Sequence, residues 1–170
     1  MATVSATNER GASAQVRHIV LAGLVIAVAN GLDQTVFAVV TQQVTPVTVF
    51  QYFASAFLGL AAFAGGYTTA LLGLLIHLVV SFVVAGVFIL AASRSAFLRR
   101  TVFVSALLYG AAISLISGAV LPFTAAPKLS VTALAVAHGV IADAFFIGLP
   151  LAFTVWLGAR ARMVSVPASA

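Results

Sequence analysis

The sequence predicts an all-α integral membrane protein, folded as a four-helix bundle with an extra interfacial or re-entrant helix. Of its 170 residues, 63% are hydrophobic and only 6% are charged, whereas about a quarter of a typical water-soluble domain is charged. The stretch from Gly65 to Ala92 contains no Asp, Glu, Lys or Arg. A helix of that length rises about 42 Å, which exceeds the roughly 30 Å hydrocarbon core of a bilayer.

The chain begins with a small and polar segment, residues 1–16, which lacks an apolar stripe and is expected to be a mobile tail. The first span is predicted over residues 17–40. The apolar run after Arg17, followed by Ala-Val-Ala at residues 27–29, imitates a secretory signal with a cleavage site. We favour an uncleaved span, because the apolar character resumes in residues 35–40.

Residues 46–64 are almost apolar and long enough to cross, but we expect this helix to lie at the interface or to dip into the bundle. Thr45 and Pro46 are suited to cap and to start it. A fifth crossing would place Arg17 on the opposite side from the arginines of residues 94–100, which contradicts the positive-inside rule.

Three further spans are predicted after a sharp turn at residues 65–66. They cover residues 66–92, 101–121 and 129–157, so that a single transmembrane domain occupies residues 17–158 and a short C-terminal tail occupies residues 159–170. Pro150 is expected to kink the last span, because proline lacks an N–H group and clashes with the preceding turn.

The positive charges give the expected orientation. With four crossings, seven of the eight Lys and Arg residues lie on the side of the two termini and of residues 94–100, and only Lys128 lies opposite. Because positively charged loops are retained in the cytoplasm, both termini are expected to be cytoplasmic in a multi-pass protein of the cell inner (plasma) membrane.

Five polar residues lie inside the predicted spans: Asn30, Asp33, His77, His138 and Asp143. At a rise of 1.5 Å per residue, all of them lie about 10–20 Å from the outer ends of their helices and so share one layer. Polar side chains at such depths are costly and turn inward. Asn30 and Asp33 share a helix face, whereas His138 and Asp143 are separated by about 140° and are expected to meet different neighbours.

Small and polar residues recur along the second span, where every fourth position is Thr69, Gly73, His77, Ser81 and Ala85. Such a ridge is expected to face protein and to leave the larger apolar side chains for lipid. The residues assigned to helix packing are Gly73, Ser81, Ala85, Gly110, Ser114 and Gly139. Ridges of this kind suit self-association, so the expected partners are the lipid bilayer and either further copies of the chain or a larger membrane complex.

Several function classes have no support in the sequence. With zero cysteines the chain forms neither disulfides nor thiolate metal sites, and it lacks the basic face that nucleic acid requires. Neither a Walker loop nor a His-Glu-x-x-His motif nor a hydrolase triad motif occurs. The first expectation is therefore a non-catalytic membrane protein or accessory subunit, with no catalytic residues and no cofactor.

A transporter for protons, ions or small solutes is the main alternative. Asp33, His77, His138 and Asp143 are the candidate relay groups, because a carboxylate and an imidazole that lie close together exchange a proton readily. Each of these residues also has a purely structural explanation, namely a hydrogen bond that holds the bundle in register.

A second alternative is axial ligation of haem b by His77 and His138, which lie at similar depths on spans that run in the same direction. Gly73 and Gly139 are next to these histidines along their helices, where a flat macrocycle would need room. A divalent metal held by the two histidines together with two aspartates is disfavoured by the angle between His138 and Asp143.

Short segments across most of the chain match one pattern: residues 31–33, 51–59, 62–66, 73–77 and 120–122, and His138 followed by residues 148–150. In these segments the chain resembles a family of small four-span bacterial inner-membrane proteins. The resemblance implies the four-span fold and carries no established activity. It includes the surroundings of His77 and His138, and it departs from the family pattern in the exterior loop at residues 122–128.

Overall fold

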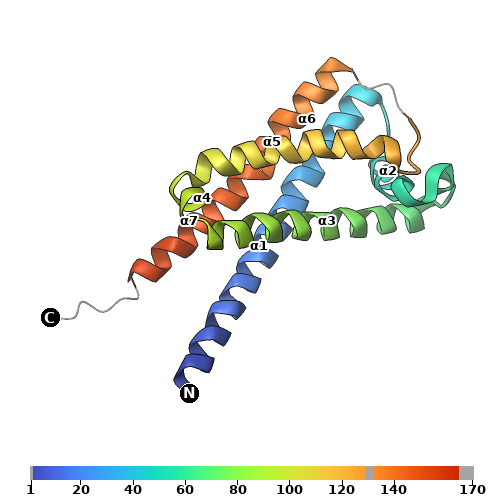
Figure 1. Ribbon diagram of the computed structural model, residues 1–170. Helices are drawn as coiled ribbons and strands as arrows, with labels where there is room; N and C mark the ends of the chain where they lie inside the picture. Colours follow the sequence, from blue (N-terminus) through green and yellow to red (C-terminus); the bar gives the residue numbers. More distant parts are fainter. Residues whose placement is uncertain (1, 129–131, 165–170) are drawn as a thin grey trace.

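The computed structural model describes the backbone of residues 2–128 and 132–164 and the side chains of residues 13–128 and 132–160, and every regular element in these ranges is a helix. The elements are α1 (Ala2–Gln42), α2 (Pro46–Leu58), the 3₁₀ helix η1 (Gly59–Ala64), α3 (Gly66–Arg94), α4 (Ala96–Arg100), α5 (Val102–Val120), the 3₁₀ helix η2 (Leu121–Phe123), α6 (Ala133–Phe146) and α7 (Gly148–Val164). Figure 1 shows α3 and α5 crossing the α1 and α6–α7 pair obliquely.

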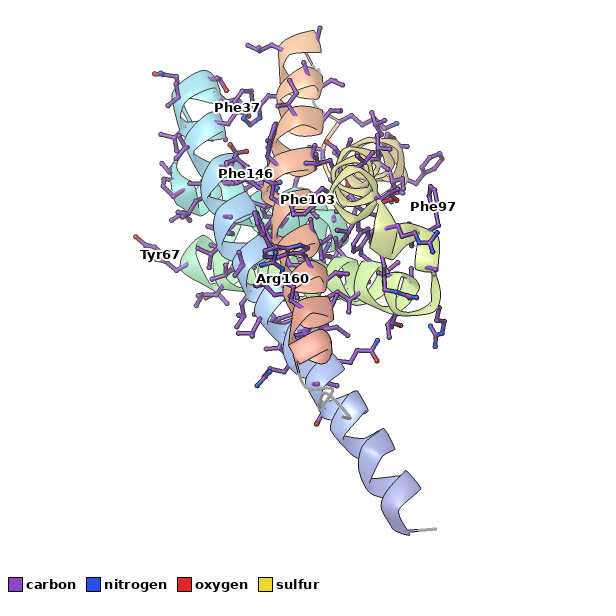
Figure 2. The ribbon with its side chains drawn as sticks, turned by 90° about the vertical axis from the view of Figure 1, so that its left-hand side faces the viewer. Phe37, Tyr67, Phe97, Phe103, Phe146 and Arg160 are labelled. Carbon is purple, nitrogen blue, oxygen red and sulfur yellow. The ribbon has the colours of Figure 1, made fainter. Side chains whose placement is uncertain are left out.

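Within the described residues, five stretches are long and apolar enough to cross a membrane: Ser13–Gln42, Pro46–Ala64, Gly66–Arg94, Val102–Phe123 and Ala133–Arg160. Their outward faces carry large apolar side chains, such as Leu71, Val83 and Leu108, which are more than half exposed. Tyr67 and Phe97 point away from the bundle in the same manner (Figure 2). This surface is consistent with a membrane protein.

The two ends of the chain are more helical than the sequence predicted. Helix α1 begins at Ala2 and runs through the segment expected to be a mobile tail, and its first turns project beyond the other helices (Figure 2). Once a helix has nucleated in its packed part, each added residue costs little, so no apolar stripe is required. Helix α7 likewise continues to Val164, inside the predicted C-terminal tail. The predicted start of the last span, residues 129–131, lies outside the described residues.

Helices α1 and α3 form an antiparallel pair through small residues. A methyl group at Gly23 would overlap Phe82, and one at Gly31 would touch His77, so these positions let the two helices approach closely. The ridge predicted along α3 faces protein, since its residues Gly73, His77, Ser81 and Ala85 are buried.

Helix α2 and η1 connect the end of α1 with the start of α3, and α2 packs against α3. The hydroxyl of Thr45 accepts a hydrogen bond from the Thr48 N–H, and Pro46 occupies the first turn, as predicted. Helix α2 then crosses α3 at Gly73, where a methyl group would overlap the Phe50 carbonyl. The chain turns into α3 at Gly66, whose positive φ of 56° favours glycine.

In the other half of the molecule, α5 packs closely on the α6–α7 segment, again with glycines at the contacts. A methyl group at Gly110 would overlap the Asp143 carbonyl, and one at Gly148 would overlap the Ala106 carbonyl. Helix α6 ends at Phe146 and α7 begins at Gly148, so the helix is interrupted at Ile147, three residues before Pro150. Proline cannot donate a hydrogen bond to the carbonyl four residues earlier, which accounts for an interruption at this place.

The two halves share one apolar core at the end of the bundle where α3 finishes and α5 begins. Its buried members are Ala22, Ile26, Val84, Ala85, Phe88, Ile89, Ala92, Val102, Ala106, Ile147, Leu151 and Ala152. The hydroxyl of Tyr109 on α5 donates to the Val84 carbonyl on α3 and adds a polar link. The other end of α1 packs on α6 through polar side chains instead.

Replacing Gly110 by alanine is expected to lower the stability by about 1–3 kcal/mol, because the added methyl group meets backbone atoms of Asp143 and Ala144 that cannot move aside. The matched control is Gly118→Ala in the same helix, where a methyl group meets nothing within 4 Å and the higher helix propensity of alanine maintains or raises stability. Thermal unfolding in detergent measures both, and equal midpoints would contradict the close helix contact.

Candidate functional site

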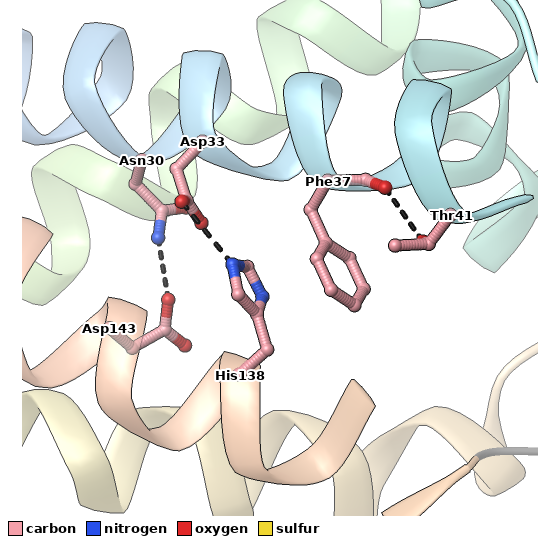
Figure 3. Close-up of polar contacts among 6 residues, drawn as sticks. All are labelled: Asn30, Asp33, Phe37, Thr41, His138 and Asp143. Carbon is pink, nitrogen blue, oxygen red and sulfur yellow. Dashed lines mark hydrogen bonds and ion pairs between the residues drawn. The ribbon is translucent and has the colours of Figure 1, made fainter. Parts of the chain in front are cut away.

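A polar cluster lies between α1 and α6, with one further member on α5. Its residues are Asn30 and Asp33 on α1, His138 and Asp143 on α6, and Ser114 on α5. Figure 3 shows the α1 and α6 side chains pointing at one another across the gap between these two helices. Four of the five polar residues predicted to share one layer are thus brought together.

Asn30 and Asp143 form the inner part of the polar cluster. Both residues are buried, and the amide of Asn30 donates a hydrogen bond to Oδ1 of Asp143. Ser114 is a second polar neighbour of the same carboxylate. A buried carboxylate needs such donors, because an unpaired charge in an apolar interior is unstable.

Asp33 and His138 form the outer part. Nε2 of His138 lies 3.4 Å from Oδ1 of Asp33, and the two side chains are 26% and 16% exposed. The imidazole also stacks on Phe37, with the ring centroids 3.8 Å apart and the planes 9° from parallel. The other oxygen of Asp33, Oδ2, is buried and is the one such side-chain atom without a hydrogen-bond partner among the described side chains.

His77, on α3, contacts a different face of α1. Its Nε2 is 3.1 Å from the Ala27 carbonyl, and its ring packs on Phe53 of α2 with centroids 4.9 Å apart. Ala27 and Gly31, the α1 positions that meet His77, are about 100° around the helix from those that meet α6. His77 therefore shares the level of the polar cluster along α1 but is separated from it by the helix itself.

This geometry does not suit haem between His77 and His138. The two imidazoles lie beside faces of α1 that are about 100° apart, and each ring has an aromatic side chain against it, Phe37 against His138 and Phe53 against His77. The adjacent glycines leave no room for a macrocycle, because Gly73 contacts Phe50 and Gly139 contacts the hydroxyl of Ser114. Within the described residues, no group of three or more His, Asp and Glu side chains is placed to hold a metal ion. Binding of a metal ion by His77 and His138 alone stays a prediction.

The assigned packing residues fall into two sets. Gly73, Ser81, Ala85 and Gly110 lie in helix contacts, whereas Ser114 belongs to the polar cluster and Gly139 only touches its hydroxyl. Phe37 and Phe53 are the site residues that the sequence did not reveal. The one available signal is the position of Phe37 one turn after Asp33, on the same helix face.

Comparisons with protein-family models, curated proteins and solved structures returned no match for the chain. The resemblance to a family of small bacterial inner-membrane proteins therefore stays a prediction. Function has to be argued from the geometry of the polar cluster.

Replacing Asn30 by leucine is expected to destabilise the protein by about 1–3 kcal/mol, because Asp143 loses its buried amide donor. The double variant Asn30→Leu/Asp143→Leu recovers part of this loss, since the carboxylate that lost its amide donor is then removed as well. Unfolding by denaturant in detergent micelles measures both. Thr41→Val is the control, because the Thr41 hydroxyl bonds only a carbonyl of its own helix (Figure 3). A double variant that is no more stable than Asn30→Leu alone would contradict the pairing.

Proposed function

We propose that the chain is an integral membrane protein that crosses the bilayer four times, along α1, α3, α5 and α6–α7. The antiparallel contact of α1 with α3 supports this, because residues 46–64 then leave and rejoin the bundle on one side. Four crossings also gather seven of the eight Lys and Arg residues on the other side. Helix α2 with η1 is then the re-entrant or interfacial element, and both termini face the cytoplasm of a bacterial cell.

The proposed activity is reversible protonation inside the membrane, as part of a transporter for protons, ions or small solutes. The observation that carries it is the pair of Asp33 and His138, in which one carboxylate oxygen is buried without a donor. Histidine is the side chain that changes charge near neutral pH. Intramembrane ionisable groups that face the bundle interior commonly mark ion and proton pathways.

The environments of the two aspartates favour this role over a purely structural one. Asp143 is buried and receives the Asn30 amide, as a group that only holds helices together would. Asp33 has a long, 3.4 Å contact with His138, outside the usual 2.7–3.2 Å range of an N–H···O hydrogen bond. A loosely held pair can change partners, which a proton carrier must do.

In the proposed mechanism, His138 and Asp33 exchange one proton. When the site carries the proton, the protonated imidazole of His138 neutralises the Asp33 carboxylate. When the proton leaves the site, the carboxylate needs another positive partner. Asn30 and Ser114 hold Asp143 in place throughout. The activity proposed is therefore exchange and transport, and the chain is not proposed to be an enzyme.

An accessory, non-catalytic subunit is the second candidate. The observation that favours it is the C-terminal half of α5, where residues 115–120 are all exposed. Gly118 lies on this exposed surface without a neighbour, since a methyl group added there would meet nothing within 4 Å. Small residues on an exposed membrane helix suit docking to another helix, either of a second copy or of a larger complex.

Single cysteines are expected to distinguish four crossings from five. The natural chain has no cysteine, so Thr45→Cys, Thr124→Cys and Ser95→Cys each provide one site for a membrane-impermeant thiol reagent. With four crossings, Thr45→Cys and Thr124→Cys react from one side and Ser95→Cys reacts from the other. Reaction of Thr45→Cys and Ser95→Cys from the same side would mean that residues 46–64 cross the membrane.

Purified protein in liposomes is expected to dissipate an imposed pH gradient, and Asp33→Asn is expected to reduce the flux to the level of empty liposomes. The reason is that the amide keeps the shape of the side chain but cannot take part in proton exchange. Thr41→Val, on the same helix, is the control and retains the wild-type rate. Wild-type rates in Asp33→Asn would contradict the proposal, and a silent wild-type protein would favour the accessory subunit.

A further inference from the structure

A groove opens beside the outer part of the polar cluster. It has a volume of about 440 Å³ and is lined by Asp33 of α1 and one face of α6, which is within the usual range of small-molecule sites. Asp33 and His138 are its charged or titratable members, and its larger apolar members are Leu134, Ile141, Phe145 and Phe146. A site of this composition accepts a molecule with an apolar body and one polar end.

The unsatisfied group next to the groove is an acceptor. Among the described side chains, Oδ2 of Asp33 has no donor, and the contact of Oδ1 is the long one with His138. A ligand that completes this carboxylate must supply N–H or O–H groups, and a positive charge strengthens the bond. Molecules that only accept hydrogen bonds gain nothing there.

The charges around the groove favour a cation. Helix α1 contributes Asp33 and the neutral Asn30, helix α6 contributes His138 and Asp143, and helix α5 contributes the neutral Ser114. No Lys or Arg side chain is among these groups. The carboxylate of Asp33 therefore has no fixed positive partner in this set other than His138, and it attracts a cation more than an anion.

We propose that this groove binds an amphipathic organic cation, namely a protonated amine with an aromatic or branched apolar body. Its ammonium group donates to Asp33, and its body lies along Phe145 and Phe146. Binding displaces the proton that His138 otherwise holds against Asp33, so one cation replaces another and the charge of the site is unchanged. The inference rests on the proposed proton exchange and names the substrate class of the same site.

The test uses the full chain in detergent micelles and two probes of equal shape, 1-naphthylmethylamine and 1-naphthalenemethanol. Equilibrium dialysis, corrected with empty micelles, is expected to show saturable binding of the amine and at least about tenfold weaker binding of the alcohol, because both can donate to the carboxylate but only the amine carries a positive charge. Equal binding of the two probes would overturn the proposal, and so would no saturable binding of the amine.

Two variants localise the binding. Asp33→Asn is expected to weaken amine binding by about tenfold or more, and Phe145→Ala, which removes an exposed ring of the groove, by a smaller factor. Thr41→Val lies outside the groove and binds as the wild type does. Gel filtration establishes that each variant is folded, and the comparison of the two probes on the wild-type chain does not depend on any variant. Unchanged binding in Asp33→Asn would overturn the proposed site.

Failure of the inference and failure of the proposed function give different results. Proton flux in liposomes is measured without amine, so flux without amine binding overturns the substrate class alone. Amine binding that depends on Asp33, in a protein that moves no protons, overturns the transport function and leaves the binding site standing.

Discussion

The hydrogen bond between Asn30 and Asp143 is a buried polar link between two halves of the molecule, which also share an apolar core. One half is α1 with α2 and α3, and the other is α5 with α6 and α7, and most helix contacts lie within each half. Each half depends on backbone contact at a glycine, Gly73 in the first and Gly110 in the second. Because Gly110 touches the backbone of Asp143 itself, the close packing of α5 also sets the height at which Asp143 meets Asn30.

The bundle is consequently different at its two ends. Residues 22 and 26 of α1 lie in the shared apolar core, where shape alone decides the fit of the helices. One to two turns further on, α1 presents Asn30 and Asp33 to α6. Directional polar contacts fix the rotation and register of a helix more strictly than apolar contacts do, so the apolar end supplies packing and the polar end supplies alignment.

The sequence predicted those features that depend on one helix at a time. The apolar length of residues 66–92, the buried ridge through His77 and the helix interruption before Pro150 all follow from local periodicity and from the chemistry of proline. The common level of the five polar residues also followed, since depth along a helix is a matter of counting residues.

Partner choice could not be predicted, because it depends on how four helices rotate and cross. Asp143 pairs with Asn30, and Asp33 pairs with His138, but the sequence equally allowed His77 as a partner for either aspartate. The stacking of Phe37 on His138 was missed for a related reason. An aromatic residue on an apolar helix is indistinguishable from a lipid contact until the neighbouring helix is placed.

Two carboxylates in one cluster with such different surroundings are best explained by different roles. Leaving a buried polar atom unpaired costs about 1–3 kcal/mol, a substantial part of the roughly 5–15 kcal/mol that stabilises a typical folded protein. Asp143 avoids that cost through Asn30, whereas one oxygen of Asp33 has no donor among the described side chains. This difference between the two aspartates, beside a histidine and an apolar groove, is the observation on which the proposed exchange of cations at Asp33 rests.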